Sequence, residues 1–270
     1  MNRIAIGAAA AALGLAAAVA LTTVSTTPPT ANAQADASGE FVATRPGQIE
    51  DPGTPRFNTG GWSTDFDISA VPFDEILSGG PGKDGIPAID DPRFESIEEA
   101  RSWVSGTAPV IALEIDGDAR AYPLAVLTWH EIVNDTVGGE PVIVTFCPLC
   151  HTALVFERTL DGTLHDFGVS GNLRLSDMVM YDRQTETWWQ QATGVGIVGE
   201  LTGAKLGFVP SQIVGLDQFA ETYPDGRVLS RDTGFARDYG RNPYVGYDTV
   251  DQQPFLFQGV TDGRLAPKER

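Results

Sequence analysis

The two cysteines of this chain lie close together in the segment Cys147-Pro148-Leu149-Cys150-His151. They are the only cysteines, and the chain has three histidines: His130, His151 and His165. Two cysteines at this spacing can form a disulfide, exchange disulfides with another molecule, or bind one metal ion through both sulfurs. This segment is therefore the candidate centre of any chemistry that the protein performs.

A metal site is the preferred interpretation. Cys147 and Cys150 would supply thiolates, His130 an imidazole, and Met180 a thioether as a candidate fourth ligand. Soft sulfur donors together with imidazole favour copper, with zinc as the alternative. If the chain is an enzyme, Cys147, Cys150 and His130 are its candidate catalytic residues, and His130 or Glu131 would transfer protons beside the metal. The sequence leaves open whether the metal serves catalysis, metal handling or sensing.

Three other interpretations of the cysteine segment remain. The first is a thiol–disulfide oxidoreductase with Cys147 as nucleophile and Cys150 as resolving thiol, but the β-branched and aromatic residues after the motif argue against the helix that such sites use. The second is a binding module with a structural disulfide. The third is covalent haem bound by Cys-x-x-Cys-His with His151 as iron ligand, which the strands expected on both sides of the motif disfavour.

The elements around the motif are mostly β-strands. Residues 141–146 (PVIVTF) form a continuous apolar run that predicts a fully buried strand leading directly into Cys147. Asp116-Gly117 and Asp161-Gly162 are typical of tight hairpin turns. Further strands are expected at 178–181 and 188–198, and short helical segments at 96–104, 128–133 and 216–223. The sequence therefore predicts an α+β fold with a mostly antiparallel β-sheet or barrel-like core and a few short helices.

The ends of the chain have their own patterns. Residues 1–33 resemble a signal peptide, with cleavage expected before Gln34, so the mature protein is expected to be exported to the periplasm or beyond. Residues 34–60 are rich in Gly, Pro, Asp and Thr, which predicts a disordered linker. Residues 61–270 are then expected to form a single domain. The chain stops at Arg270 without a closing strand, which indicates a domain shortened at its C-terminus.

The charge of the chain limits its partners. With a formal net charge of −18, the protein would repel nucleic acid and anionic lipid. The expected partners are a metal ion or a small molecule, with no nucleic acid and no membrane association after signal-peptide cleavage. The sequence does not determine the oligomeric state. His165 is expected at the surface of a hairpin strand, and Trp188 and Trp189 in the core.

Several short motifs, taken together and in order, carry a family resemblance. From about residue 62 onward the chain resembles the family called domain of unknown function 3179 in VPFDEILSGG (71–80), RAYPL (120–124), HEIVND (130–135), CPLC (147–150), Ser170-Gly171 and MYD (180–182). The resemblance implies that His130, Cys147, Cys150 and Met180 occupy family motif positions, but it supplies no activity for them. His151 departs from the family pattern, in which a small or polar residue commonly follows the second cysteine. The family pattern also continues past Arg270, in line with a shortened form.

Overall fold

The computed structural model describes residues 33–35, 41–43, 47–247 and 256. The chain forms two units, residues 1–43 and 44–270, which are described separately. In the first unit, β1 (Ala33–Ala35) pairs antiparallel with β2 (Phe41–Ala43). The expected signal peptide lies almost entirely outside the described residues, so its cleavage stays a prediction. None of the helices in the described part of the chain has the length and apolar character needed to span a bilayer.

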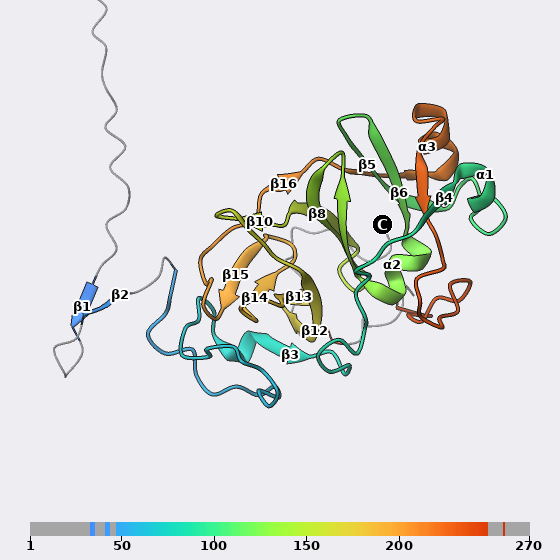
Figure 1. Ribbon diagram of the computed structural model, residues 1–270. Coiled ribbons are helices and arrows are strands. Elements are labelled where there is room, and N and C mark those ends of the chain that lie inside the picture. The colour runs from blue at the N-terminus through green and yellow to red at the C-terminus, as the bar shows by residue number, and fades with distance from the viewer. Residues whose placement is uncertain (1–32, 36–40, 44–46, 248–255, 257–270) are drawn as a thin grey trace, which may run out of the picture. The chain divides into compact units, whose positions relative to one another are not determined.

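The second unit contains three larger sheets (Figure 1). The β13 sheet has the strand order β15 (Val195–Val198), β14 (Trp188–Gln190), β13 (Asp177–Asp182), β12 (Phe167–Arg174), β3 (Ile76–Ser78). The β8 sheet has the order β16 (Phe208–Val209), β9 (Thr152–Glu157), β8 (Glu140–Cys147), β7 (Ile132–Val137). The β5 sheet has the order β17 (Gln212–Gly215), β5 (Pro109–Ile115), β6 (Asp118–Pro123), β18 (Arg227–Leu229), β4 (Phe94–Ser96).

Short elements complete the unit. A small hairpin joins β10 (Thr159–Leu160) to β11 (Thr163–Leu164), and the helical elements are the 3₁₀ turn η1 (Phe73–Glu75), α1 (Ile97–Ala100), α2 (Leu124–His130) and α3 (Leu216–Thr222). Among the described strands of this unit, all pairs within the sheets are antiparallel except β6 with β18. The predicted α+β class is confirmed. Of the two core arrangements that the sequence allowed, the open sheets are present, and the described strands do not close into a barrel.

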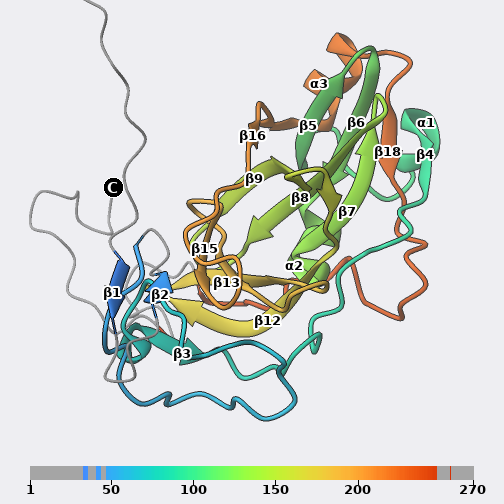
Figure 2. The ribbon, with the colours of Figure 1, turned by 60° about the vertical axis from the view of Figure 1, so that its left-hand side comes forward.

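Strand β8, which Figure 2 shows between β9 and β7, lies between two hydrophobic cores. Its residues Val142, Val144 and Phe146 pack into a core shared with the β5 sheet and α2. Alternate residues, including Ile143 and Cys147, pack into a second core shared with the β13 sheet. Because side chains alternate between the two faces of a strand, a strand covered on both faces must be apolar throughout. This confirms the predicted buried strand, and the same alternation turns Cys147 toward the β13 sheet.

Local sequence signals specify several element ends. Both hairpin turns predicted at Asp-Gly have positive φ at their two residues, 49° and 85° at Asp116-Gly117 and 49° and 80° at Asp161-Gly162. Ser96 and Glu99 form a reciprocal capping box at the start of α1, as expected, although the helix ends at Ala100. Helix α3 agrees with the predicted segment 216–223.

Helix α2 differs from its prediction. The sequence placed a helical segment at 128–133, whereas α2 covers Leu124–His130 and β7 starts at Ile132. Pro123, which has an extended backbone, ends β6 and directly precedes the helix. The helix begins earlier than expected because Leu124 and Leu127 bury their side chains in the core shared with β8. Tertiary packing thus decides where the helix begins, which the local pattern at 128–133 did not show.

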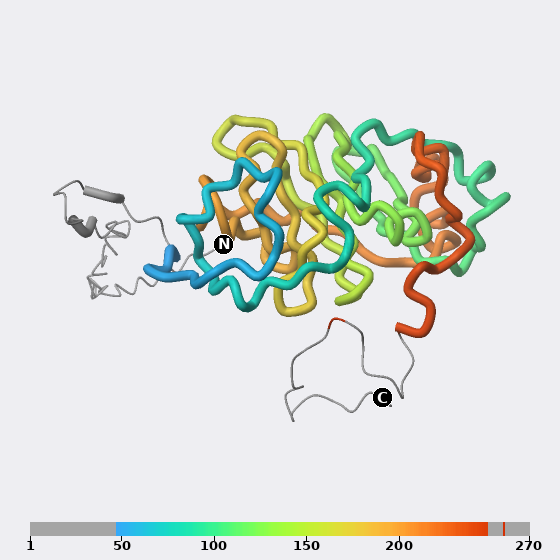
Figure 3. The backbone as a smooth tube through the Cα atoms, turned by 90° about the horizontal axis from the view of Figure 1, so that it is seen from below, coloured from blue at the N-terminus to red at the C-terminus, as the bar shows by residue number. Residues whose placement is uncertain are grey.

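Ordered packing starts before residue 60, where the sequence placed the end of a disordered linker. Phe57 is buried, and its ring lies 5.6 Å from that of Phe73 and 4.9 Å from that of Trp188. Figure 3 shows the segment from residue 47 onward, in blue, running along the strands of the β13 sheet, in yellow and orange. The linker prediction failed for these residues because a single aromatic side chain can hold a Gly- and Pro-rich segment against an apolar face of a sheet. The composition of the segment does not show that such a face lies nearby.

Candidate metal centre

The cysteine motif forms the tip of the β8–β9 hairpin. Cys147 is the last residue of β8 and pairs with Thr152, the first residue of β9. Residues 148–151 make the turn, and His151 adopts a φ of +55°. The backbone N–H of Cys150 donates a hydrogen bond to the sulfur of Cys147 at 3.4 Å. The turn therefore brings both sulfurs to one side, and both cysteines are free thiols in the structure.

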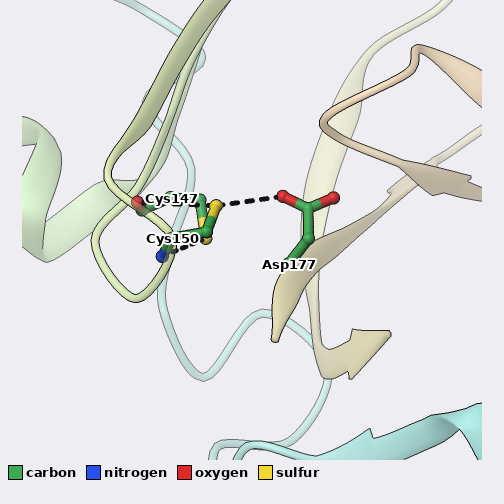
Figure 4. Close-up of side chains that lie close together, drawn as sticks. All are labelled: Cys147, Cys150 and Asp177. Carbon is green, nitrogen blue, oxygen red and sulfur yellow. Dashed lines mark hydrogen bonds between the residues drawn. The ribbon is translucent and has the colours of Figure 1, made fainter. Parts of the chain in front are cut away.

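Asp177 joins the two cysteines from the neighbouring β13 sheet (Figure 4). Its Oδ1 lies 3.1 Å from the sulfur of Cys150, and the ligand atoms of Cys147, Cys150 and Asp177 all lie within 4.8 Å of one another. Its Oδ2 accepts hydrogen bonds from the Gln190 side chain and, at 2.9 Å, from the Ala192 N–H. Two sulfurs and an oriented carboxylate at this separation can hold a metal ion.

Asp177 owes its position to an unusual turn. It starts β13 and pairs with Arg174 at the end of β12, so that only Leu175 and Ser176 connect the two strands. Both turn residues have positive φ, 51° and 66°, which is the geometry of a two-residue hairpin normally made by Asn-Gly or Asp-Gly. Leu175 and Ser176 are not typical residues of such a turn, so the local sequence does not reveal that Asp177 lies beside the cysteines.

Among the residues that the structure describes, no basic side chain pairs with the three acidic groups. None of the ion pairs within the described part of the chain includes Asp177. Arg174, its partner across the hairpin, donates instead to Glu75 and Gln190. Cys147 and Asp177 are buried, and buried anions without a counter-charge are costly. The cluster therefore has to retain protons or receive a cation.

The two thiols differ in acidity. Hydrogen bonding to Cys150 and burial raise the pKa of Cys147, whereas the hydrogen bond from Cys147 lowers the pKa of Cys150. Cys150 is also the more exposed of the two. This difference favours Cys150 over Cys147 as the thiol that ionises first, and the assignment of nucleophile and resolving thiol stays a prediction. A thiolate at Cys150 would face the carboxylate of Asp177 at 3.1 Å, so its formation favours a cation between them.

The structure does not bring His130 into this cluster. Its Nδ1 lies 2.7 Å from the Pro87 carbonyl oxygen, and its Nε2 lies 2.7 Å from the Tyr239 hydroxyl. Since a carbonyl only accepts, Nδ1 carries the proton and Nε2 accepts from Tyr239. Burial lowers the pKa of His130, which favours this neutral form. Both nitrogens of His130 are thus engaged in hydrogen bonds, and Asp177 is the third group that the structure brings beside the cysteines.

The other residues that the sequence marked as candidates, Met180, His165, Trp188 and Trp189, are all buried. Met180 is buried in the same hydrophobic core as Cys147 and next to Trp189 on β14. His165 is buried rather than at the surface as expected, with 4% of its surface exposed and its Nδ1 3.3 Å from Asp182. That correction arises because a short local pattern cannot show that the end of β13 and the turn after it lie beside His165 and Asp166. Trp188 and Trp189 are core residues as predicted.

Glu131 lies close to the cysteine turn in an unusual environment. It follows α2, has a φ of +60°, and is only 6% exposed. Within the described part of the chain, one hydrogen bond reaches its carboxylate, from the Tyr244 hydroxyl at 3.2 Å. Burial raises the pKa of Glu131 to about 7. The side chain lines a cavity of about 180 Å³ together with Leu149 of the cysteine turn and Met178, the neighbour of Asp177.

The segment 232–247 covers this region with three tyrosines. The segment has no regular helix or strand, and it lies far along the chain from the residues it covers. Tyr239 contacts His130, Tyr244 contacts Glu131, and the Tyr247 hydroxyl donates to the Leu149 carbonyl oxygen at 2.7 Å. A segment distant in sequence therefore holds both the end of α2 and the cysteine turn in place.

The comparison with known proteins agrees with the motifs. Residues 83–270 match the family model described as protein of unknown function (DUF3179). The match covers Glu131, both cysteines and Asp177. No curated protein and no solved structure has a significant match to the chain. This chain belongs to the DUF3179 family.

Proposed function

We propose that this protein binds one soft metal ion through the sulfurs of Cys147 and Cys150 and a carboxylate oxygen of Asp177. The observation that carries the proposal is the meeting of these three groups within 4.8 Å, with no ion pair to Asp177 from any basic side chain in the described part of the chain. A divalent cation would replace the missing counter-charge and would be held by deprotonated thiols. Asp177 is already oriented by Gln190 and Ala192, as carboxylate ligands of metals usually are.

The donor set favours zinc over copper. Thiolates bind both metals, but a carboxylate oxygen is a hard donor that suits zinc and not copper(I). Copper, preferred from the sequence, depended on His130 and Met180. His130 uses both of its nitrogens in other hydrogen bonds, and Met180 packs in the adjacent core. Three protein ligands leave a fourth position of a tetrahedral zinc ion for water or substrate, which is the pattern of catalytic zinc sites.

Export is part of the same proposal. The signal-peptide pattern of residues 1–33 supports it, and a metal would also explain two unpaired cysteines outside the cytoplasm, where free thiols tend to become oxidised. The metal would protect the thiols by holding them as ligands.

Elemental analysis tests the proposal. The full chain is produced with its own signal and purified without a metal-binding tag, and zinc and copper are measured beside three variants: Cys150→Ser, Asp177→Asn and, as a matched control, the exposed Asp91→Asn. We expect close to one equivalent of zinc in the wild type and in Asp91→Asn, and a loss of metal in the other two. Stoichiometric metal in Cys150→Ser, or metal-free wild type that cannot be loaded, contradicts the proposal.

Thiol–disulfide exchange is the second candidate, favoured by the unequal acidity of the two thiols. In that function Cys150 would attack the substrate disulfide and Cys147 would resolve the mixed disulfide. The reduction potential of the pair distinguishes this from a structural disulfide, which typically lies below about −300 mV. A potential well above that value in metal-free protein would support exchange.

A further inference from the structure

An apolar cavity borders the proposed metal centre. It measures about 180 Å³, and its lining includes Leu149, Val169, Leu173 and Met178. Leu149 lies between the two cysteines in the turn, and Met178 follows Asp177 in β13. A molecule in this cavity would therefore contact both elements that carry the proposed metal ligands.

The cavity has one strong hydrogen-bond acceptor among its side chains. Glu131 and Tyr244 are the only titratable side chains among the described residues that line it. The backbone of Glu131 is held in its left-handed conformation by two hydrogen bonds, from its N–H to the Leu127 carbonyl at 2.7 Å and from the Phe146 N–H to its carbonyl at 2.8 Å. A non-glycine residue adopts this conformation only when its surroundings enforce it, and such positions cluster at functional sites.

The carboxylate of Glu131 has spare capacity to accept hydrogen bonds. A carboxylate can accept about four, and within the described part of the chain this one accepts a single hydrogen bond, from Tyr244 at 3.2 Å. Its raised pKa of about 7 reflects the same lack of donors in a buried place. A ligand that supplies an O–H would complete the environment of Glu131.

We infer that the cavity binds a small, mainly apolar molecule with one hydroxyl group, of about the size of a phenol, whose hydroxyl donates to the carboxylate of Glu131. An apolar cavity of about 150 Å³ accommodates benzene, so the size is sufficient for one ring. Anions are disfavoured because the ionised carboxylate of Glu131 would repel them, and no basic side chain is among the described residues that line the cavity. This inference deepens the proposed function by naming the class of molecule beside the metal, although the binding itself does not require the metal.

Calorimetric titration tests the inference with phenol, toluene and benzoate as probes. The full chain is titrated twice, after chelation and after loading with zinc. At pH 8, where Glu131 is largely ionised, we expect saturable phenol binding in both states, at least about tenfold tighter than that of toluene, because hydrogen bonds to charged groups are the strong ones. Addition of phenol should also shift the methyl signal of Met178 in NMR spectra.

The variant Glu131→Leu separates the hydroxyl contact from simple apolar binding. It keeps the volume of the side chain, so it should retain toluene binding and lose the preference for phenol. If Glu131→Leu does not fold, as judged by circular dichroism, Glu131→Gln serves instead and should reduce the preference at least threefold. Absence of phenol binding in both metal states, an unchanged preference in the variant, or tighter binding of benzoate overturns the inference.

The two proposals can fail separately. Phenol binding by a protein that takes up no zinc would contradict the metal centre alone. Stoichiometric zinc in a protein that does not bind phenol would contradict the cavity ligand alone.

Discussion

Two carboxylates four residues apart, Glu131 and Asp135, are equally buried and have opposite environments. Each is 6% exposed. Asp135 accepts hydrogen bonds from the Arg120 guanidinium at 2.6 Å, the Tyr122 hydroxyl at 2.6 Å and the Thr136 N–H at 2.7 Å. Glu131 accepts one, from Tyr244. The comparison shows that two equally buried carboxylates can differ in the number of donors they receive, and the one with few donors is the candidate for a functional role.

The surroundings of Asp135 and the cysteine cluster differ in the same way in their charge balance. Arg120, from the RAYPL motif, pairs with Asp118 and with Asp135 of the HEIVND motif, so two family motifs combine into one closed network. Around Cys147, Cys150 and Asp177 no such base is present among the described residues. The first region stabilises the fold, and the second retains unsatisfied groups that a metal and a ligand would satisfy.

The largest effect is expected from breaking the closed network. Arg120→Leu leaves Asp135 buried without its cation, so the free energy of unfolding should fall by about 3–5 kcal/mol. Urea unfolding measures this change. Arg93→Ala, which removes the exposed pair with Asp232, is the control and should cost less than about 1 kcal/mol. Equal losses in the two variants would contradict a structural role for the network.

Glu131 should make stability depend on pH. Its pKa is raised to about 7 in the folded protein, so the folded state holds this proton over a range in which the unfolded state has released it. Stability should therefore fall as the pH rises from about 4.5 to 7, by about 3 kcal/mol in total. Urea unfolding of metal-free protein at pH 5 and pH 8 should show this loss, and Glu131→Gln should lack it. The same pH dependence in both proteins would refute the assignment.

Asp177→Asn should separate metal binding from folding. Asparagine keeps an oxygen that can accept from Gln190 and Ala192 but loses the charge, so zinc affinity should fall about 100-fold while the stability of metal-free protein stays within about 1 kcal/mol. Competition with a chromophoric chelator measures the affinity. An unchanged affinity would leave Asp177 as a structural residue, like Asp135.

The smallest effect is expected at the covering segment. Tyr247→Phe removes the hydrogen bond to the Leu149 carbonyl, which should cost about 1 kcal/mol and accelerate amide exchange in residues 148–151 about fivefold. Hydrogen exchange followed by mass spectrometry detects the change. Tyr223→Phe, whose ring packs on Phe219, is the control and should leave this exchange unchanged. Unaltered exchange in Tyr247→Phe would show that the segment does not hold the turn.

The sequence by itself determined the local features of this protein. The apolar run 141–146 predicted a buried strand, the Asp-Gly pairs predicted tight turns, and Ser96 with Glu99 predicted a helix start. These features depend on residues that are close in sequence, because side-chain alternation, turn geometry and capping are local. The cysteine pair and the family were visible for the same reason.

Only the tertiary structure decided which distant groups meet at the cysteines. It brought Asp177 across from another sheet, engaged His130 with Pro87 and Tyr239, and buried His165 and Phe57. Each of these contacts depends on how the separate sheets and the segment 232–247 pack together. The same local sequence pattern is compatible with many other tertiary arrangements. The third group of the site was therefore hidden in the sequence as one of many acidic residues, until the fold placed it 3.1 Å from Cys150.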